Sequence, residues 1–256
     1  MRDSTRTQIT AAAVCITVAA TLAAGGRVTH PTVASAAGAG GLPQGGEPVQ
    51  LNPADFSVNI TNPYWPMVPG NRWVFNERQP DGNRERVVMT VTDETKKIAN
   101  GVTARVVRDV ASQGRKLVEV TDDWYAQDAA GNVWYLGEDA KDFENGRLVS
   151  SRGSWQWGVR GALPGIIMWA DPAAHVGESY RQEYFKGEAE DWGKVIATNV
   201  TVQVGVGLLA GCVQTEDWSG IEADAYEYKY YCPMVGEAAS SKRNGAERHQ
   251  LIKSVP

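Results

Sequence analysis

The stretch Asp123–Asp139, DWYAQDAAGNVWYLGED, predicts a β-hairpin and sets the fold class. Its turn, Asp128–Gly131, ends on a glycine, which can adopt the positive φ that such a turn requires. The turn brings Tyr125 near Trp134. Neighbouring residues of a strand point to opposite faces, so each strand of the hairpin separates its Trp from its Tyr. The four aromatic side chains therefore cannot form one flat platform.

Strand-like runs continue on both sides of this hairpin. Each is rich in β-branched and aromatic residues and is bounded by the Gly and Asn typical of turns. The runs are Arg84–Thr95, Gly101–Ala111, Gly114–Asp128, Asn145–Trp157, Glu178–Phe185, Lys194–Gly205, Cys212–Trp218, Ala225–Cys232 and a closing pair around Asn244-Gly245. This spacing predicts an all-β fold, an antiparallel meander that forms a barrel, a half-barrel or a sandwich. The segment Gly158–Gly177 breaks the pattern and is expected to be an irregular central loop that plugs the core or covers a pocket.

The N-terminal region has the pattern of an export signal. Basic Arg2 and Arg6 precede an apolar run, Ile9–Ala24, and Ala34-Ser35-Ala36 offers a small-residue cleavage site. We expect residues 1–36 to be a signal peptide, 37–55 a flexible Gly/Pro-rich linker, and 56–256 one β domain. No later segment is long and apolar enough to span a membrane.

The charge balance limits the partners. The chain carries a net charge of −5, and loss of residues 1–36 would remove three arginines and one aspartate, which leaves −7. Neither nucleic acid nor an anionic membrane would attract such a protein. A secreted or cell-envelope-associated protein is expected.

Cys212 and Cys232 would remain after cleavage. An even number of cysteines in an exported chain favours a disulfide, with two free thiols as the alternative. If a turn near Glu222 joins two antiparallel strands, the two cysteines face each other, and the same register pairs Trp218 with Tyr226.

Several motifs resemble those of a family of exported bacterial β-rich proteins with no assigned activity. They are YWPMVPGNRWVF (Tyr64–Phe75), the hairpin stretch above, PGIIMWADP, YRQEYFKGEAED and YEYKYYCPMVG. The resemblance runs from about Asn62 to the C-terminus and implies export and a β-rich fold. Similar sequences often lack a cysteine where Cys232 stands.

Acidic residues gather at two strand ends and supply two hypotheses. Oxygen ligands from Glu138, Asp139, Glu188 and Asp191 could hold a cation such as Ca²⁺, although neither group has the spacing of an EF-hand loop. Alternatively, Glu138 and Glu183 could be the paired carboxylates of a glycosidase-like hydrolase. Solvated turn residues are the competing explanation for both groups.

Trp155, Trp157 and Trp169 are candidates for a ligand pocket. The first two share one face of a strand, and the third lies in the irregular segment. Together these patterns favour a secreted barrel-like protein that binds a small hydrophobic or carbohydrate ligand, with a structural cation as an optional addition. A hydrolase and a non-catalytic structural or envelope protein are the alternatives.

Overall fold

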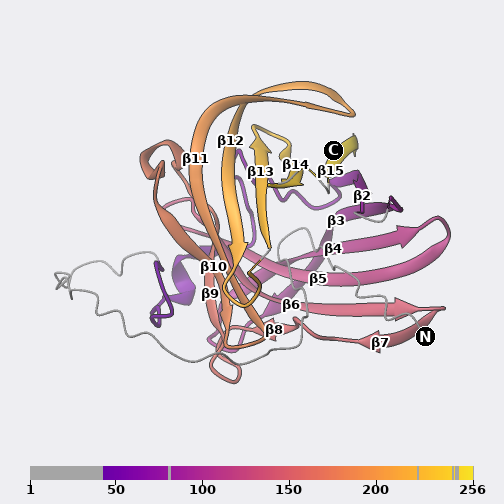
Figure 1. The fold of residues 1–256 in the computed structure, drawn as a ribbon. Helices are drawn as coiled ribbons and strands as arrows, with labels where there is room; N and C mark the ends of the chain where they lie inside the picture. The colour runs from indigo at the N-terminus through magenta and orange to yellow at the C-terminus, as the bar shows by residue number, and fades with distance from the viewer. Residues whose placement is uncertain (1–42, 80–81, 224, 244, 246–247, 256) are drawn as a thin grey trace, which may run out of the picture.

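The protein is a closed β-barrel of twelve antiparallel strands with three extra short strands paired to two of them (Figure 1). The computed structural model describes residues 43–79, 82–223, 225–243, 245 and 248–255. The expected signal peptide, residues 1–36, lies outside them. The barrel strands are β2 (Arg72–Arg78), β3 (Arg84–Lys97), β4 (Thr103–Gln113), β5 (Lys116–Asp128), β6 (Val133–Glu144), β9 (Leu163–Met168), β10 (Ser179–Phe185), β11 (Ala189–Val204), β12 (Gly207–Ser219), β13 (Tyr226–Cys232), β14 (Gly236–Lys242) and β15 (Arg248–Val255).

The barrel closes at β6, which pairs with β5 on one edge and with several strands on the other. Near its start β6 pairs with β9, and β9 pairs with β10. Further along, the same edge receives two short strands, β8 (Trp155–Gln156) and β7 (Arg147–Ser150). Another short strand, β1 (Phe56–Ser57), pairs with the end of β5. β6 thus joins the barrel wall to strands that lie outside it.

The central segment 158–177 is more regular than its composition indicates. Leu163–Met168 forms β9, and Pro172–His175 forms a short 3-10 helix, η2. Pro164 and Gly165 concealed this strand, because both residues are uncommon inside strands. A side chain at Gly165 would lie 2.3 Å from the backbone oxygen of Arg181, so β9 and β10 can approach only at a glycine.

The hairpin β5–β6 forms as predicted, with a register one residue different. Tyr125 pairs with Tyr135 and their rings stack at 4.9 Å, whereas Trp134 pairs with Ala126. The hydroxyl of Tyr135 donates to Asp123 at 2.6 Å. A bulge then shifts the register between Asp123 and Tyr125. The tyrosines are completely buried, so this face of the hairpin points into the barrel.

The predicted disulfide is confirmed. Cys212 on β12 bonds to Cys232 on β13, and the two strands have the expected register. Trp218 pairs with Tyr226, and their rings stack at 6.2 Å. Asn244, in the expected closing turn, lies outside the described residues, but β14 and β15 pair antiparallel as expected.

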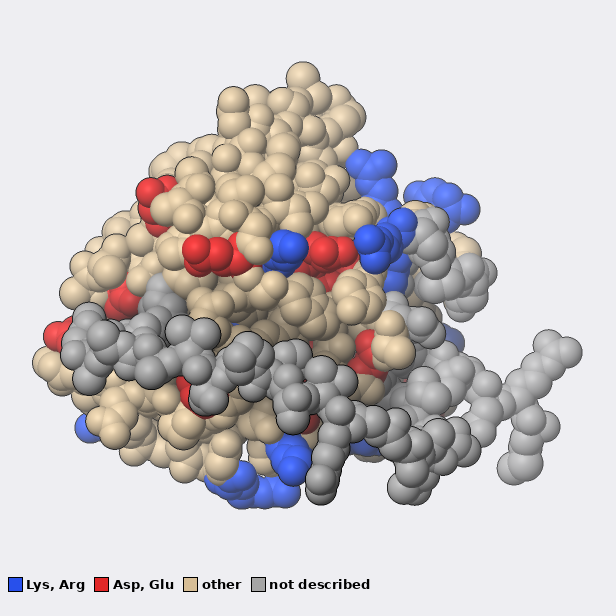
Figure 2. Space-filling view, turned by 60° about the vertical axis from the view of Figure 1, so that its left-hand side comes forward, with Lys and Arg blue, Asp and Glu red and all other residues tan. Residues whose placement is uncertain are grey.

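The hairpin β11–β12 arches beyond the barrel (Figure 1). Residues 195–215 contain no charged side chain. Accordingly, the protruding top of the molecule shows no Lys, Arg, Asp or Glu in Figure 2. Gly205 lets the hairpin lie against β15, because a side chain there would meet Ile252 at 2.8 Å.

Part of the expected linker lies against the barrel. The Arg181 guanidinium, on β10, donates to the backbone oxygens of Gly45 and Glu47. A 3-10 helix, η1 (Pro53–Asp55), then leads into β1. None of the helices in the described part of the chain has the length and apolar character needed to cross a bilayer.

Candidate functional site

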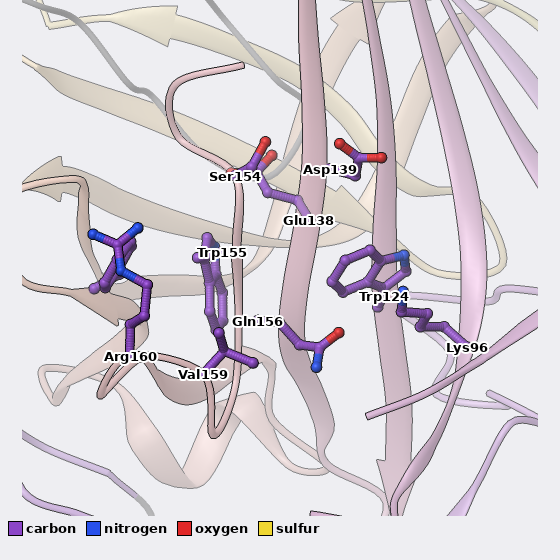
Figure 3. Close-up of a pocket in the computed structure, with 10 residues that line it drawn as sticks. Lys96, Trp124, Glu138, Asp139, Ser154, Trp155, Gln156, Val159 and Arg160 are labelled. Carbon is purple, nitrogen blue, oxygen red and sulfur yellow. The ribbon is translucent and has the colours of Figure 1, made fainter. Parts of the chain in front are cut away.

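A pocket of about 360 Å³ opens on the barrel wall beside β6, which is within the usual size range of small-molecule sites (Figure 3). Its walls come from strands β3, β5, β6, β8 and β10 and from the turn after β8. The residues that line it are Lys96, Trp124, Glu138, Asp139, Ser154, Trp155, Gln156, Val159, Arg160 and Phe185. In Figure 3, Trp155 and Trp124 lie on opposite sides of Glu138 and Gln156.

Gly137, the neighbour of the lining residue Glu138, allows the strands around this pocket to approach closely. Its φ is 140°, and it pairs with Gln156 of β8. A Cβ atom there would lie 2.5 Å from the backbone oxygen of Trp155 and 2.9 Å from a ring carbon of Trp124. Only a glycine therefore allows β8 to pair here while the Trp124 ring packs on the same residue.

The two indoles are fixed walls of the pocket. Trp155 packs edge-on against Tyr135, with ring centroids 5.3 Å apart and an interplanar angle of 87°. The Nζ of Lys96 lies 4.7 Å from the centre of the Trp124 ring. The indoles are only 4% and 7% exposed, so neither can move freely when a ligand enters. The pocket is therefore largely preformed on this side.

Glu138 is the buried acid of the pocket wall. It pairs across the sheet with Asp123 and is 2% exposed. Burial raises its pKa well above the ordinary range, and the nearby carboxyls of Glu183 and Asp123 raise the pKa further. Its Oε2 has no hydrogen-bond partner among the described residues. A neutral carboxyl here can both donate and accept a hydrogen bond.

The candidate catalytic pair, Glu138 and Glu183, does come together. Glu183 lies on β10 opposite Asp191 of β11 and is fully buried. Burial and the Asp191 carboxyl raise the pKa of Glu183, and the indole N–H of Trp155 opposes this rise. Glu183 does not line the pocket, however. The pair therefore presents one carboxyl to the pocket, whereas glycoside hydrolysis needs two that flank the bond.

The candidate cation ligands are divided between several places. Asp191 belongs to the buried acidic group around Glu138, Asp139 pairs with Lys141 at 2.5 Å, and Glu188 lies in the turn between β10 and β11. Within the described residues, no group of three or more His, Cys, Asp or Glu side chains could hold a metal ion. The four acids thus do not form one site.

Only one of the three candidate tryptophans lines the pocket. Trp155 lines the pocket. Trp157 is 7% exposed and belongs to the hydrophobic core, and its backbone N–H donates to Leu136. Trp169 is 1% exposed, and its ring stacks on His175 at 3.7 Å. The latter two therefore support the fold around the pocket without contributing to its lining.

Several lining residues were not among the sequence candidates. Trp124 is one of them: the strand period separates it from Tyr125, but only the structure shows that the Tyr125 face points into the barrel and that Trp124 lines the pocket. Gln156, Lys96 and Arg160 had no signal of their own, because barrel closure alone brings their segments together.

The structure is a closed antiparallel β-barrel with a cleft on its wall, an architecture that is compatible with ligand binding. Comparison of the chain with known proteins finds no matching family model, no matching curated protein and no matching solved structure.

Proposed function

We propose that the protein is an exported binding protein whose wall pocket holds a carbohydrate. The observation that carries this proposal is the pair of fixed indoles, Trp124 and Trp155, on either side of Glu138 and Gln156 (Figure 3). Sugars present apolar C–H faces together with hydroxyl groups, so they suit a pocket with aromatic walls and a few convergent polar groups. A wholly apolar ligand would cover the buried Glu138 carboxyl and the half-buried Gln156 amide without offering them hydrogen-bond partners, which is costly.

Export is part of the proposal. The Cys212–Cys232 disulfide supports it, because such bonds form and persist in oxidising compartments. The signal-like pattern in residues 1–36 and the resemblance to exported β-rich proteins point in the same direction. Mass spectrometry of the protein from culture supernatant tests this directly, since it reports the cleavage site and the state of the cysteines together.

Hydrolysis is the second candidate, and the convergence of Glu138 with Glu183 is the observation that favours it. Binding is the better-supported function, because Glu183 is fully buried and lies outside the lining of the pocket. Incubation with oligosaccharides and measurement of new reducing ends separates the two. Turnover that Glu183→Gln abolishes would establish the hydrolase in place of the binding protein.

Calorimetric titration with a panel of soluble neutral and acidic oligosaccharides tests the binding function. Gln156→Ala and Glu138→Leu are each expected to weaken binding about tenfold, because each removes a side-chain hydrogen-bonding group worth roughly 1.5 kcal/mol. Trp192→Leu is the matched control, since Trp192 is half-buried on β11 and does not line the pocket. Equal affinity in all four proteins would show that the glycan binds elsewhere.

A further inference from the structure

Two cations lie over aromatic rings of the pocket. Lys96 lies over Trp124, and the guanidinium carbon of Arg160 lies 5.1 Å from the centre of the Phe185 ring. Cation–π contacts of this kind hold a charged side chain in place and leave its N–H groups free to donate. In Figure 3, Arg160 lies beyond Trp155 and Lys96 lies beside Trp124, so the two cations stand at opposite ends of the pocket.

The acidic residues of the pocket do not neutralise the positive charges of Lys96 and Arg160. The Asp139 carboxylate is already paired with Lys141 at 2.5 Å. Glu138 is 2% exposed, and burial favours its neutral form. The ends of the pocket are thus positive, although the whole chain carries a net charge of −5.

The backbone at Arg160 supports a specific role for its side chain. Arg160 has a φ of 52°, which residues other than glycine rarely adopt. It occupies a tight turn in which Gly158 donates to the oxygen of Ala162, and Ala162 donates back to Val159. A glycine would fit this position without strain, so the arginine is retained at a conformational cost. Strained positions of this kind cluster at active sites and ligand-binding sites, and Arg160 is the positive-φ residue other than glycine that lines the pocket within the described residues.

We propose that the glycan held in this pocket is acidic, with one carboxylate or sulfate group bound by Lys96 and another by Arg160. This inference rests on the proposed carbohydrate function and specifies the class of glycan. Lysine ammonium and arginine guanidinium groups both donate charge-assisted hydrogen bonds to such oxyanions. The sugar rings between the two anionic groups lie along the indoles and meet the polar side chains of Gln156 and Glu138.

A tetramer of galacturonic acid and its fully methyl-esterified form are matched probes, because they share the same sugar backbone and the ester replaces each charged carboxylate by a neutral group with one added methyl. A chondroitin sulfate tetrasaccharide adds sulfate groups. Calorimetry on the full-length mature protein at low and moderate salt measures the three affinities. We expect an anionic probe to bind at least tenfold more tightly than the ester, and its advantage to shrink as salt increases.

Lys96→Met and Arg160→Met remove one charge each and keep most of the side-chain length. Each is expected to weaken binding of the anionic probe about tenfold and to leave binding of the ester nearly unchanged. Lys97→Met and Arg152→Met are the matched controls, since both residues are exposed and neither lines the pocket. Thermal melting of every variant confirms that it is folded.

The outcomes separate the two proposals. Tighter binding of the galacturonate tetramer identifies carboxylates as the anionic groups, and tighter binding of the chondroitin tetrasaccharide identifies sulfates. Equal affinity for the acidic and esterified tetramers, or a preference for acid that survives in the Lys96→Met/Arg160→Met double variant, overturns the acidic-glycan inference and leaves the carbohydrate function standing. If neither these probes nor the neutral oligosaccharides of the calorimetric panel bind, the proposed function itself is wrong.

Discussion

The buried carboxyl of Glu119 predicts how the free energy of unfolding depends on pH. This residue of β5 is 7% exposed, faces Asp142 of β6, and accepts a hydrogen bond from Thr121 at 2.9 Å. Burial raises its pKa from 4.5 to about 8, and the neighbouring Asp142 and Asp123 carboxyls raise it as well. In the folded protein Glu119 therefore keeps its proton across a pH range in which the unfolded chain has lost it.

The sign follows from this difference in bound protons. Between pH 4.5 and about 8 the folded state binds more protons at Glu119, so the free energy of unfolding falls as the pH rises through this window. At about 1.4 kcal/mol per pH unit, the contribution of this single group between pH 5 and 8 is roughly 3 to 4 kcal/mol. Asp123 and Glu237, whose pKa values burial raises to about 7, act in the same direction.

Urea unfolding of the wild type and of Glu119→Gln at pH 5, 6.5 and 8 measures the effect. The neutral amide keeps an acceptor for Thr121 and cannot ionise, so the variant should match the wild type at pH 5 and exceed its stability at pH 8 by about 3 kcal/mol. Glu144→Gln, an exposed position on β6, is the control. A wild type whose stability is constant or rises from pH 5 to 8, or a variant with the same pH dependence as the wild type, refutes the reasoning.

Two further changes test the scaffold around the pocket. Replacing Cys212 and Cys232 by Ser opens a loop with a sequence separation of 20 residues, and chain-entropy arguments give a loss of about 3 kcal/mol in unfolding free energy, measurable by urea unfolding with and without reductant. Unchanged stability would show that the bond does not constrain the unfolded chain. Gly137→Ala should cost about 1 to 3 kcal/mol beyond its backbone strain and weaken glycan binding, because its Cβ would meet the backbone of β8 at 2.5 Å. Gly161→Ala is the control, because Gly161 also has a positive φ, 86°, but no atom lies within 4 Å of the added carbon. If both variants lose the same unfolding free energy, the steric argument for Gly137 is wrong.

Local pairing in this fold follows from the sequence to a considerable extent. The positions of Cys212 and Cys232 gave the correct register of β12 and β13, because a short hairpin with a bond across it allows few registers. The β5–β6 register differs by one residue from the sequence prediction, and β9 was hidden by Pro164 and Gly165. The register is set by the turn, which closes with the N–H of Asp128 donating to the oxygen of Asn132, one residue beyond the glycine that the sequence prediction took as its end. The strand β9 depends on a tertiary contact, because its glycine admits the backbone of β10.

The pocket is harder to predict than the strands, because it depends on how the barrel closes. Sequence patterns identified Glu138 and Trp155, which pair directly across β6 and β8. The cations at the two ends come from β3 and from the turn after β8, segments about 60 residues apart in the chain. No repeating pattern in the sequence predicts that these segments meet. They come close because one edge of β6 pairs first with β9 and then, further along, with β8. At Gly137 the backbone of β8 and the Trp124 ring both approach β6 more closely than a side chain would allow, so the irregularity that conceals the pocket in the sequence also brings its walls together in the structure.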